Sequence, residues 1–393
     1  MNILICGVNW LGDACMSMPA LQVFRSQQPD LKITMLTRPA LKPLWELHPC
    51  IDSTIPLTPT LAGMRKATRL VKALDAQEAY IFPNSWRSAL IPYFARVPHR
   101  IAQRGHHRSL ILTKTVQPKM RSAPPCHQQW EYVKILRLVN VTELPPPSLT
   151  IPEAAKQTVD AILSADATPW VGILPGAARG PSKQWPQEHF ISAAKQIADA
   201  HKCHFVLLGT AAEELLCQEI GAALGERAIS LAGKTSLPEL TAVLERCSTV
   251  LCNDSGGMHL AAAVGVPVVA VYGITAPTKT GPLGDGHHLI CADGITASRD
   301  VPRDSSEARE ALRSIFPQRV AEAALEILTR PSCPNRKSAF GEMLRQAQHD
   351  SSCEMLHPNI RRDQHDSLLG NPSSQRVSFR AKPRNLGLGN TPS

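Results

Sequence analysis

The chain has 393 residues, of which 43% are hydrophobic and 19% charged, so it is long enough for two domains with buried cores. Its formal charge of +9 is uneven: residues 1–160 carry +9, residues 161–330 carry −4 and residues 331–393 carry +4. A basic first part predicts an anionic partner, such as a nucleic acid, a phosphorylated glycolipid or a membrane surface. The eleven cysteines show no C-x-x-C spacing, which argues against a zinc site or disulfide framework and predicts reduced thiols in a cytoplasmic protein.

The N-terminus begins with an apolar run that has no early Lys or Arg, so we expect no signal peptide. The longest apolar stretch, from Leu260 to Ile274, is short and interrupted by Gly and Pro, and cannot span a bilayer. Any contact with a membrane is therefore expected to be peripheral.

The first predicted unit is a strand over Asn2–Val8, a turn in NWLGD and a helix over residues 16–28. The glycines are too sparse for a dinucleotide-binding fingerprint, and Asp13 stands where a phosphate would be repelled. A carboxylate at the carboxyl end of the first strand is better interpreted as an acid or base of a site. A cap of the following helix is the alternative, and the spacing favours neither.

The next segments alternate between strands and helices, which indicates a mostly parallel sheet. Asn84 and Ser85 directly follow the last of these strands and could meet a polar ligand, although an ordinary helix cap has equal weight. The predicted strands are Lys32–Leu36 and Ala79–Phe82, and the predicted helices are Leu41–Leu47 and Ala62–Ala73.

Residues 96–121 hold seven Lys and Arg and no Asp or Glu. Arg100, Arg104 and Arg108 share a four-residue spacing, but Gly105 interrupts any continuous helix. Such a run usually forms a solvated face, and without interleaved aromatic residues it does not favour binding to single-stranded nucleic acid. Phosphates or carboxylates of a glycolipid suit it better.

A Pro-rich segment from Leu144 to Ala155 predicts a linker between two α/β domains, 1–160 and 161–330. After a helix over Ala154–Ser164, the second half alternates again until a final helix over Ala321–Thr329. Residues 331–393 lose this periodicity, repeat QHDS and have a composition typical of disorder, so we assign them no function. The expected elements between are strands at 170–174, 204–208 and 228–231 and helices at 187–200, 211–223 and 237–246.

The segment Thr249–Gly273 is predicted to form a strand, a polar turn, a helix and a second strand. Ser255, Gly256 and Gly257 would leave the amides of the helix N-terminus open to a phosphate, with Asp254 and His259 on either side; a simple helix cap is the alternative. A second turn of this type, Pro175–Phe190, contains Gly176 and Lys183. Two such turns suggest a nucleotide in a cleft between domains.

These two segments, PGA…GP.K.WP and DSG..H..AA, resemble the glycosyltransferases that add heptose to the inner core of lipopolysaccharide, glycosyltransferase family 9. The resemblance covers about residues 1–330, and PNS..SA at residues 83–89 is similar to the heptosyltransferase II type. It implies a GT-B fold, with an acceptor-binding domain before an ADP-sugar-binding domain. It also implies inverting transfer from ADP-heptose to the first heptose of a heptosylated Kdo-lipid A.

The resemblance also implies roles for individual residues. Asp13 would be the general base and Lys183 would contact the donor phosphate or sugar, with Gln184 departing from the family's basic residue. Further donor contacts would fall on Gly176, Glu213, Thr235, Asp254, Ser255, Gly256, Gly257 and His259, and acceptor contacts on Asn84, Ser85, Arg100, Arg104 and Arg108.

No D-x-D pair stands at a strand end, so we expect no metal and no cofactor. We expect an enzyme on the inner face of the inner membrane, in peripheral contact with its anionic surface, and no nucleic acid partner. A heptosyltransferase of another inner-core position, an epimerase acting on UDP-sugars and a basic nucleic-acid-binding protein remain alternatives.

Overall fold

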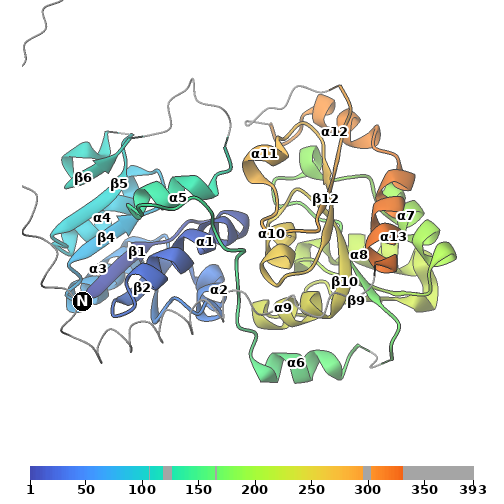
Figure 1. Ribbon diagram of the computed structural model, residues 1–393, viewed down its shortest axis with the longest axis horizontal. Helices are drawn as coiled ribbons and strands as arrows, with labels where there is room; N and C mark the ends of the chain where they lie inside the picture. Colours follow the sequence, from blue (N-terminus) through green and yellow to red (C-terminus); the bar gives the residue numbers. More distant parts are fainter. Residues whose placement is uncertain (106, 118–125, 164–165, 295–301, 331–393) are drawn as a thin grey trace, which may run out of the picture. The chain divides into compact units, whose positions relative to one another are not determined.

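The computed structural model describes residues 1–105, 107–117, 126–163, 166–294 and 302–330. The described residues all belong to one compact unit. The described residues contain two six-stranded sheets in which every pair of neighbouring strands is parallel, with helices packed on them (Figure 1). This confirms the predicted α/β class, whereas the predicted domain boundaries at residues 160 and 330 stay predictions.

The first sheet has the strand order β3-β2-β1-β4-β5-β6. Its central strand β1 is almost fully buried, as expected for a short apolar strand covered on both faces. The strands are β1 Asn2–Cys6, β2 Lys32–Thr37, β3 Ser53–Pro56, β4 Glu78–Ile81, β5 His99–Gln103 and β6 Lys114–Val116. The helices are α1 Leu11–Gln27, α2 Lys42–Glu46, α3 Leu61–Ala73, α4 Trp86–Phe94 and α5 Gln129–Ile135, with 3₁₀ turns at Pro39–Leu41 and Arg108–Leu110.

The second sheet has the order β12-β11-β10-β7-β8-β9. Its strands are β7 Trp170–Leu174, β8 His204–Leu207, β9 Ala228–Ser230, β10 Cys247–Asn253, β11 Val268–Tyr272 and β12 His288–Cys291. Its helices are α6 Glu153–Asp160, α7 Gln187–Ala200, α8 Glu214–Leu224, α9 Leu237–Arg246, α10 Gly256–Ala263, α11 Pro277–Thr280, α12 Ser306–Arg313 and α13 Pro317–Thr329, with 3₁₀ turns at Pro181–Lys183, Ala211–Glu213 and Gly225–Arg227.

Most elements expected from periodicity are confirmed, and those that were missed are short or polar. The basic run at 96–121 contains two short strands, β5 and β6, which the sequence did not predict: only Ile101 and Ala102 of β5 are buried, and β6 is a mostly exposed edge strand. Helix α1 begins at Leu11, five residues before its expected start. The segment 144–152 forms no helix or strand, and its role as a linker between two domains stays a prediction.

The segment 144–152 is hydrogen-bonded to the buried side chain of Gln22 on α1. Its Nε2 donates to the carbonyl of Pro146 (3.1 Å) and its Oε1 accepts from the backbone N–H of Ser148 (3.2 Å). Further along, the N–H of Thr150 donates to the carbonyl of Leu47 (2.8 Å). Gln22 thereby satisfies backbone groups of a segment that has no ladder of its own.

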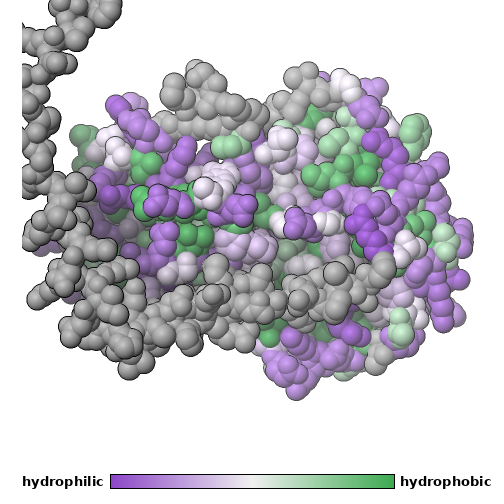
Figure 2. Space-filling view, in the orientation of Figure 1, coloured by the Kyte–Doolittle hydropathy of each residue, from purple (hydrophilic) through white to green (hydrophobic). Residues whose placement is uncertain are grey.

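Helix α1 packs against α10 of the second sheet as well as against α5. One buried apolar cluster includes Met16 and Ala20 of α1 together with Leu260 and Ala263 of α10. On the face shown in Figure 2, hydrophilic side chains lie among smaller hydrophobic areas. Among the described helices, none has the length and apolar character needed to cross a bilayer.

Candidate functional site

Four of the predicted site residues follow the strands at which the strand order of each sheet reverses. In the first sheet this point lies between β1 and β4, which are followed by Asp13 and Asn84. In the second sheet it lies between β7 and β10, which are followed by Lys183 and Asp254. Parallel α/β sheets form a crevice beyond the carboxyl ends of the strands at such points, and ligands bind there.

The turn after β10 is built for close packing. Asp254 is nearly buried, Ser255 occupies the N-cap position of α10, and Gly256 begins the helix. A Cβ atom at Gly257 would lie 2.9 Å from Cδ1 of Leu174 at the end of β7. The glycine therefore lets the first turn of α10, with its exposed amides, approach the neighbouring strand.

Asn253, the last residue of β10, joins the two predicted phosphate-type turns. Its fully buried amide accepts from the N–H of Trp185 (2.9 Å) and donates to the carbonyls of Pro175 (2.8 Å) and Gly176 (3.3 Å). Asn253 lies in the segment Thr249–Gly273, for which the sequence predicts only a strand followed by a polar turn at this point. Its position before the DSGG turn was the available signal, but its partners lie about 70 residues away in the sequence.

Lys183 and Asp254, each predicted to contact the donor, form an ion pair with one another. The Asp254 carboxylate also accepts from the hydroxyl of Thr275 (2.8 Å). The exposed fractions of the two side chains are only 15% for Lys183 and 7% for Asp254. The ammonium group of Lys183 is therefore only weakly solvated beside the turn after β10. The Asp254 carboxylate compensates this charge, so an anionic ligand would compete with Asp254 for the Lys183 ammonium.

The 3₁₀ turn that carries Lys183 is hydrogen-bonded to the residues just before α12. The buried Ser182 hydroxyl lies 2.6 Å from the carbonyls of Pro302 and Arg303, and accepts from the N–H of Ser305 (2.9 Å). At the start of this turn, Gly180 has a φ of +87°, a backbone conformation that glycine adopts easily and other residues only with strain.

His259 lies in the first half of α10 and is buried against α1. A Cβ atom at Gly12 would be only 2.7 Å from its Cδ2 atom, so Gly12 is the residue that admits the imidazole. Burial lowers the pKa of His259 to about 4, although the Asp254 carboxylate opposes this shift. The ring is therefore neutral near pH 7 and can donate or accept one hydrogen bond without carrying charge.

Asp13 lies in the first turn of α1 and not at its N-cap, which is Trp10. Its Oδ1 accepts from Nε2 of Gln128 (3.1 Å). The role of Asp13 as a base stays a prediction. Because Gly12 contacts His259, the backbone next to Asp13 adjoins the second sheet's turn directly.

Gly176, Glu213 and Thr235 come from the loops after β7, β8 and β9. The carboxylate of Glu213 fills the space where a side chain of Gly176 would be, and it accepts from the N–H (2.7 Å) and the hydroxyl (2.9 Å) of Thr210. The structure thus brings Gly176 and Glu213 together. Glu213 also forms a capping box with Thr210 at the start of the 3₁₀ turn Ala211–Glu213. Thr235 is half-buried and directly precedes Ser236, the N-cap of α9.

The predicted acceptor residues are not equally placed. Ser85 caps α4, accepting from the N–H of Ser88 (3.3 Å), and Asn84 beside it is exposed. Arg104 is exposed directly after β5.

Arg100 and Arg108 correct the expectation of a solvated basic face. Fully buried Arg108 donates to the carbonyls of Gln103 (2.6 Å) and Pro83 (2.6 Å), and Arg100 donates to those of Val97 (2.5 Å) and Ile111 (2.7 Å). Both guanidinium groups therefore bind backbone carbonyls of neighbouring loops. The two arginines do not share a helical face, because Arg100 lies on β5 and Arg108 in a 3₁₀ turn.

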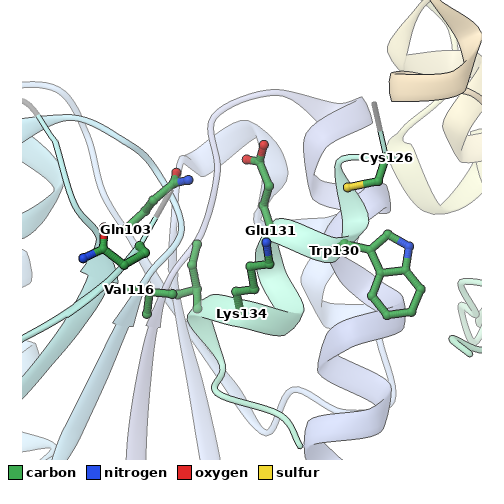
Figure 3. Close-up of a pocket in the computed structure, with 8 residues that line it drawn as sticks. Gln103, Val116, Cys126, Trp130, Glu131 and Lys134 are labelled. Atoms are coloured by element: carbon green, nitrogen blue, oxygen red, sulfur yellow. The ribbon is translucent and has the colours of Figure 1, made fainter. Parts of the chain in front are cut away.

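Two cavities lie away from these residues. A small one of about 10 Å³, room for about one water, is lined by Gln103 and Val116 on the strand side and by Glu131 and Lys134 of α5 (Figure 3), which is too small for a sugar. A larger one of about 740 Å³ lies among the linker, the end of α10 and residues 283–287, and no predicted site residue lines it. Within the described residues, no three or more His, Cys, Asp or Glu are grouped to hold a metal ion.

Comparison with known proteins gives a consistent family. Residues 65–309 match glycosyltransferase family 9 (heptosyltransferase). The chain is 32% identical to lipopolysaccharide heptosyltransferase 2 of Escherichia coli K12, over 82% of this chain and 97% of that protein. It is 33% identical to lipooligosaccharide heptosyltransferase 2 of Haemophilus influenzae, over 74% of this chain and 88% of that protein.

The solved structure of E. coli ADP-heptose lps heptosyltransferase II is similar along most of the chain. It superposes with a TM-score of 0.73 and 30% identity, covering 84% of this chain and 98% of that one. The two parallel sheets are those of a GT-B glycosyltransferase. The family match, the relatives and the shared fold together show that this chain belongs to glycosyltransferase family 9, the heptosyltransferases.

Proposed function

We propose that this chain transfers L-glycero-D-manno-heptose from ADP-heptose to the first heptose of a lipopolysaccharide inner core. The names of its relatives, heptosyltransferase 2, support this acceptor position. The observation that carries the proposal is that Gly12, next to Asp13 in one half, lies against His259 of the other half. The charges that act on His259 include those of the paired Lys183 and Asp254, which follow the strands on either side of the strand-order reversal in the second sheet.

In the proposed reaction, the acceptor hydroxyl oxygen bonds to the anomeric carbon while the bond from that carbon to the diphosphate oxygen breaks. Asp13 takes the hydroxyl proton, and ADP leaves with the electron pair of the broken bond. Direct displacement inverts the anomeric centre. Lys183 and the amides of Ser255 to Gly257 would stabilise the charge that grows on the leaving oxygen.

On the acceptor side, the proposal rests on exposed Asn84 and Arg104, which follow β4 and β5. A guanidinium can bind a phosphate or sugar-acid carboxylate in bidentate fashion. We place no acceptor contact on Arg100 or Arg108, because backbone carbonyls occupy their guanidinium groups.

The direct test is incubation of the full chain with ADP-heptose and a mono-heptosylated Kdo-lipid A, followed by mass spectrometry of the lipid. A gain of one heptose is expected. Transfer only to an acceptor that lacks heptose, or only to one that already carries two, would assign another inner-core position. Turnover of a UDP-sugar without any heptose transfer would overturn the proposal.

The proposed acceptor lies in a membrane, and α4 offers a surface for peripheral contact on the cytoplasmic side. Trp86, Tyr93 and Phe94 are 40%, 42% and 60% exposed, and basic Arg87 and Arg96 accompany them. Aromatic residues with arginines suit the boundary of an anionic bilayer. Helix α4 begins next to Asn84, so a membrane on this surface would lie beside the acceptor end of the site.

Co-sedimentation with vesicles tests this contact. We expect binding to vesicles containing phosphatidylglycerol and little binding to pure phosphatidylcholine. Changing Tyr93 and Phe94 to Ser should weaken it several-fold, whereas Phe316→Ser, 69% exposed before α13, should not. Equal loss in both variants would remove α4 from the proposal.

A further inference from the structure

Gln128 sits immediately before α5 and its side chain amide faces Asp13. Nε2 lies 3.1 Å from Oδ1 of Asp13 and 3.1 Å from the hydroxyl oxygen of Tyr132, one turn along α5. The amide nitrogen has two hydrogens, so it can donate to both oxygens at once. Tyr132 is only 3% exposed and packs against Phe82, which fixes the direction of the amide.

The same residue is tied to the second sheet through its backbone. The N–H of Gln128 donates to the carbonyl of Lys279 in α11 (2.9 Å). The neighbouring His127 makes a parallel contact, with Nε2 3.0 Å from the carbonyl of Gly281. Nδ1 of His127 accepts from the N–H of Gln129 (3.2 Å), which assigns the ring proton to Nε2 and makes His127 the donor to Gly281.

Residues 127 and 128 therefore join three elements: the start of α1, the first turn of α5 and the α11 region of the second half. Two backbone carbonyls of the second half fix this segment, and its side chain amide then donates to the carboxylate of Asp13.

We infer that Gln128 is a positioning residue for the reaction, which orients the Asp13 carboxylate through its side chain amide and depends on the Lys279 and Gly281 contacts for its own placement. This rests on the proposed function, in which Asp13 is the base. Charge-assisted hydrogen bonds of this kind are stronger than neutral ones, and small errors in the position of a base slow proton transfer.

The test is Gln128→Met, which keeps an unbranched side chain of similar length and removes the donor. We expect kcat for heptose transfer to fall about 10- to 100-fold, with KM for ADP-heptose changed less than threefold. Gln129→Met makes the same change one residue further along, where the backbone N–H is what contacts His127, and should stay within twofold of the unchanged chain.

The pH profile separates positioning from a merely structural role. The Gln128 amide stabilises the ionised carboxylate, so its loss should move the acid limb of the pH–kcat profile to higher pH. Among the described residues, the titratable groups around the first turn of α1 include Tyr132 and Glu131 of α5 and His259 of α10. His127, Lys183 and Asp254 act on His259 in turn, and all of these groups are retained in the variant. A shift relative to Gln129→Met therefore reports on Asp13.

Gln128→Glu provides a second variant with the opposite electrostatics. A second carboxylate beside Asp13 should move the acid limb further than Gln128→Met does. Unchanged kcat and unchanged pH limb in a folded Gln128→Met protein would overturn the inference while heptose transfer by the unchanged chain still stands. Absence of transfer by the unchanged chain would instead overturn the proposed function.

Discussion

At the scale of single residues, the proposed role of Asp13 as the base can be tested directly. This residue lies in the third position of α1 and receives the Gln128 amide. We expect Asp13→Asn to lower turnover about 10²- to 10⁴-fold, because the amide keeps the shape but loses the basic lone pair. Calorimetry should find ADP binding almost unchanged. Near-normal turnover in a folded Asp13→Asn protein would require a different base.

Lys183 and Asp254 stabilise one another, so each single change should leave a weakly solvated partner without its counter-ion. We expect Lys183→Met to cost about 3 kcal/mol in the free energy of unfolding. Adding Asp254→Asn should recover part of this loss, because the unpaired carboxylate is then removed. Urea unfolding of the two single variants and the double variant measures the coupling. Strictly additive losses would show that the pair contributes nothing.

Buried His259 makes stability depend on pH. Its folded pKa of about 4 lies below the usual value near 6.5, so the unfolded chain binds a proton first as the pH falls. This contribution is fully present above pH 6.5 and is lost toward pH 4, by up to about 3 kcal/mol. Between pH 7 and 4, urea unfolding should show that the free energy of unfolding of His259→Gln falls less steeply with pH than that of the unchanged chain. His99 is exposed, so His99→Gln should show the same pH dependence as the unchanged chain.

At the scale of elements, the packing of α1 on α10 decides the site, and glycines permit it. A Cβ at Gly12 would approach His259 to 2.7 Å, and one at Gly256 would approach Cβ of Leu11 to 3.0 Å. Both are closer than side chains can pack without displacement, so an added methyl group must push the helices apart.

We expect Gly12→Ala to lower stability by about 1–3 kcal/mol and to reduce transfer more than its loss of folded protein explains. Gly221→Ala, inside α8, is the matched control, because its Cβ would meet only Leu207 Cδ2 at an ordinary 3.7 Å. This control should gain about 0.5–1 kcal/mol from helix propensity. Thermal unfolding and transfer rates of both variants provide the comparison, and a stabilised, fully active Gly12→Ala protein would contradict it.

At the scale of the whole molecule, the two sheets are complete by the end of α13. Val320, Ala324 and Ile327 of this helix are buried in the cluster that includes Phe190 and Ile197 of α7. Residues 331–393 lack the apolar periodicity that a core contribution requires.

Removing residues 331–393 should therefore leave the free energy of unfolding and the rate of heptose transfer within about twofold of the full chain. Circular dichroism, urea unfolding and the transfer assay on the shortened chain check this expectation. An insoluble or inactive shortened chain would place the end of the folded part beyond Arg330.

The sequence by itself determined the alternation of parallel strands and helices, because buried apolar strands and amphipathic helices have distinct periods. It also determined which turns carry Gly176, Lys183 and Asp254, since turn chemistry is local. Arg100 and Arg108 show the limit of spacing: a four-residue interval suggested one face, but both side chains turn to backbone carbonyls of neighbouring loops.

Only the tertiary structure decided which of these residues meet. Lys183 pairs with Asp254 across 71 residues, Asn253 reaches back 78 residues to Pro175, and Gln128 reaches Asp13 across 115. Such contacts depend on the order of strands in a sheet and on the packing of α1 against α10, neither of which has a local signature. Packing of α1 on α10 brings Gly12 against His259, and packing of α1 on α5 brings Gln128 to Asp13. The sequence shows no sign of either contact, because the importance of a glycine or an amide depends on the surface that it faces.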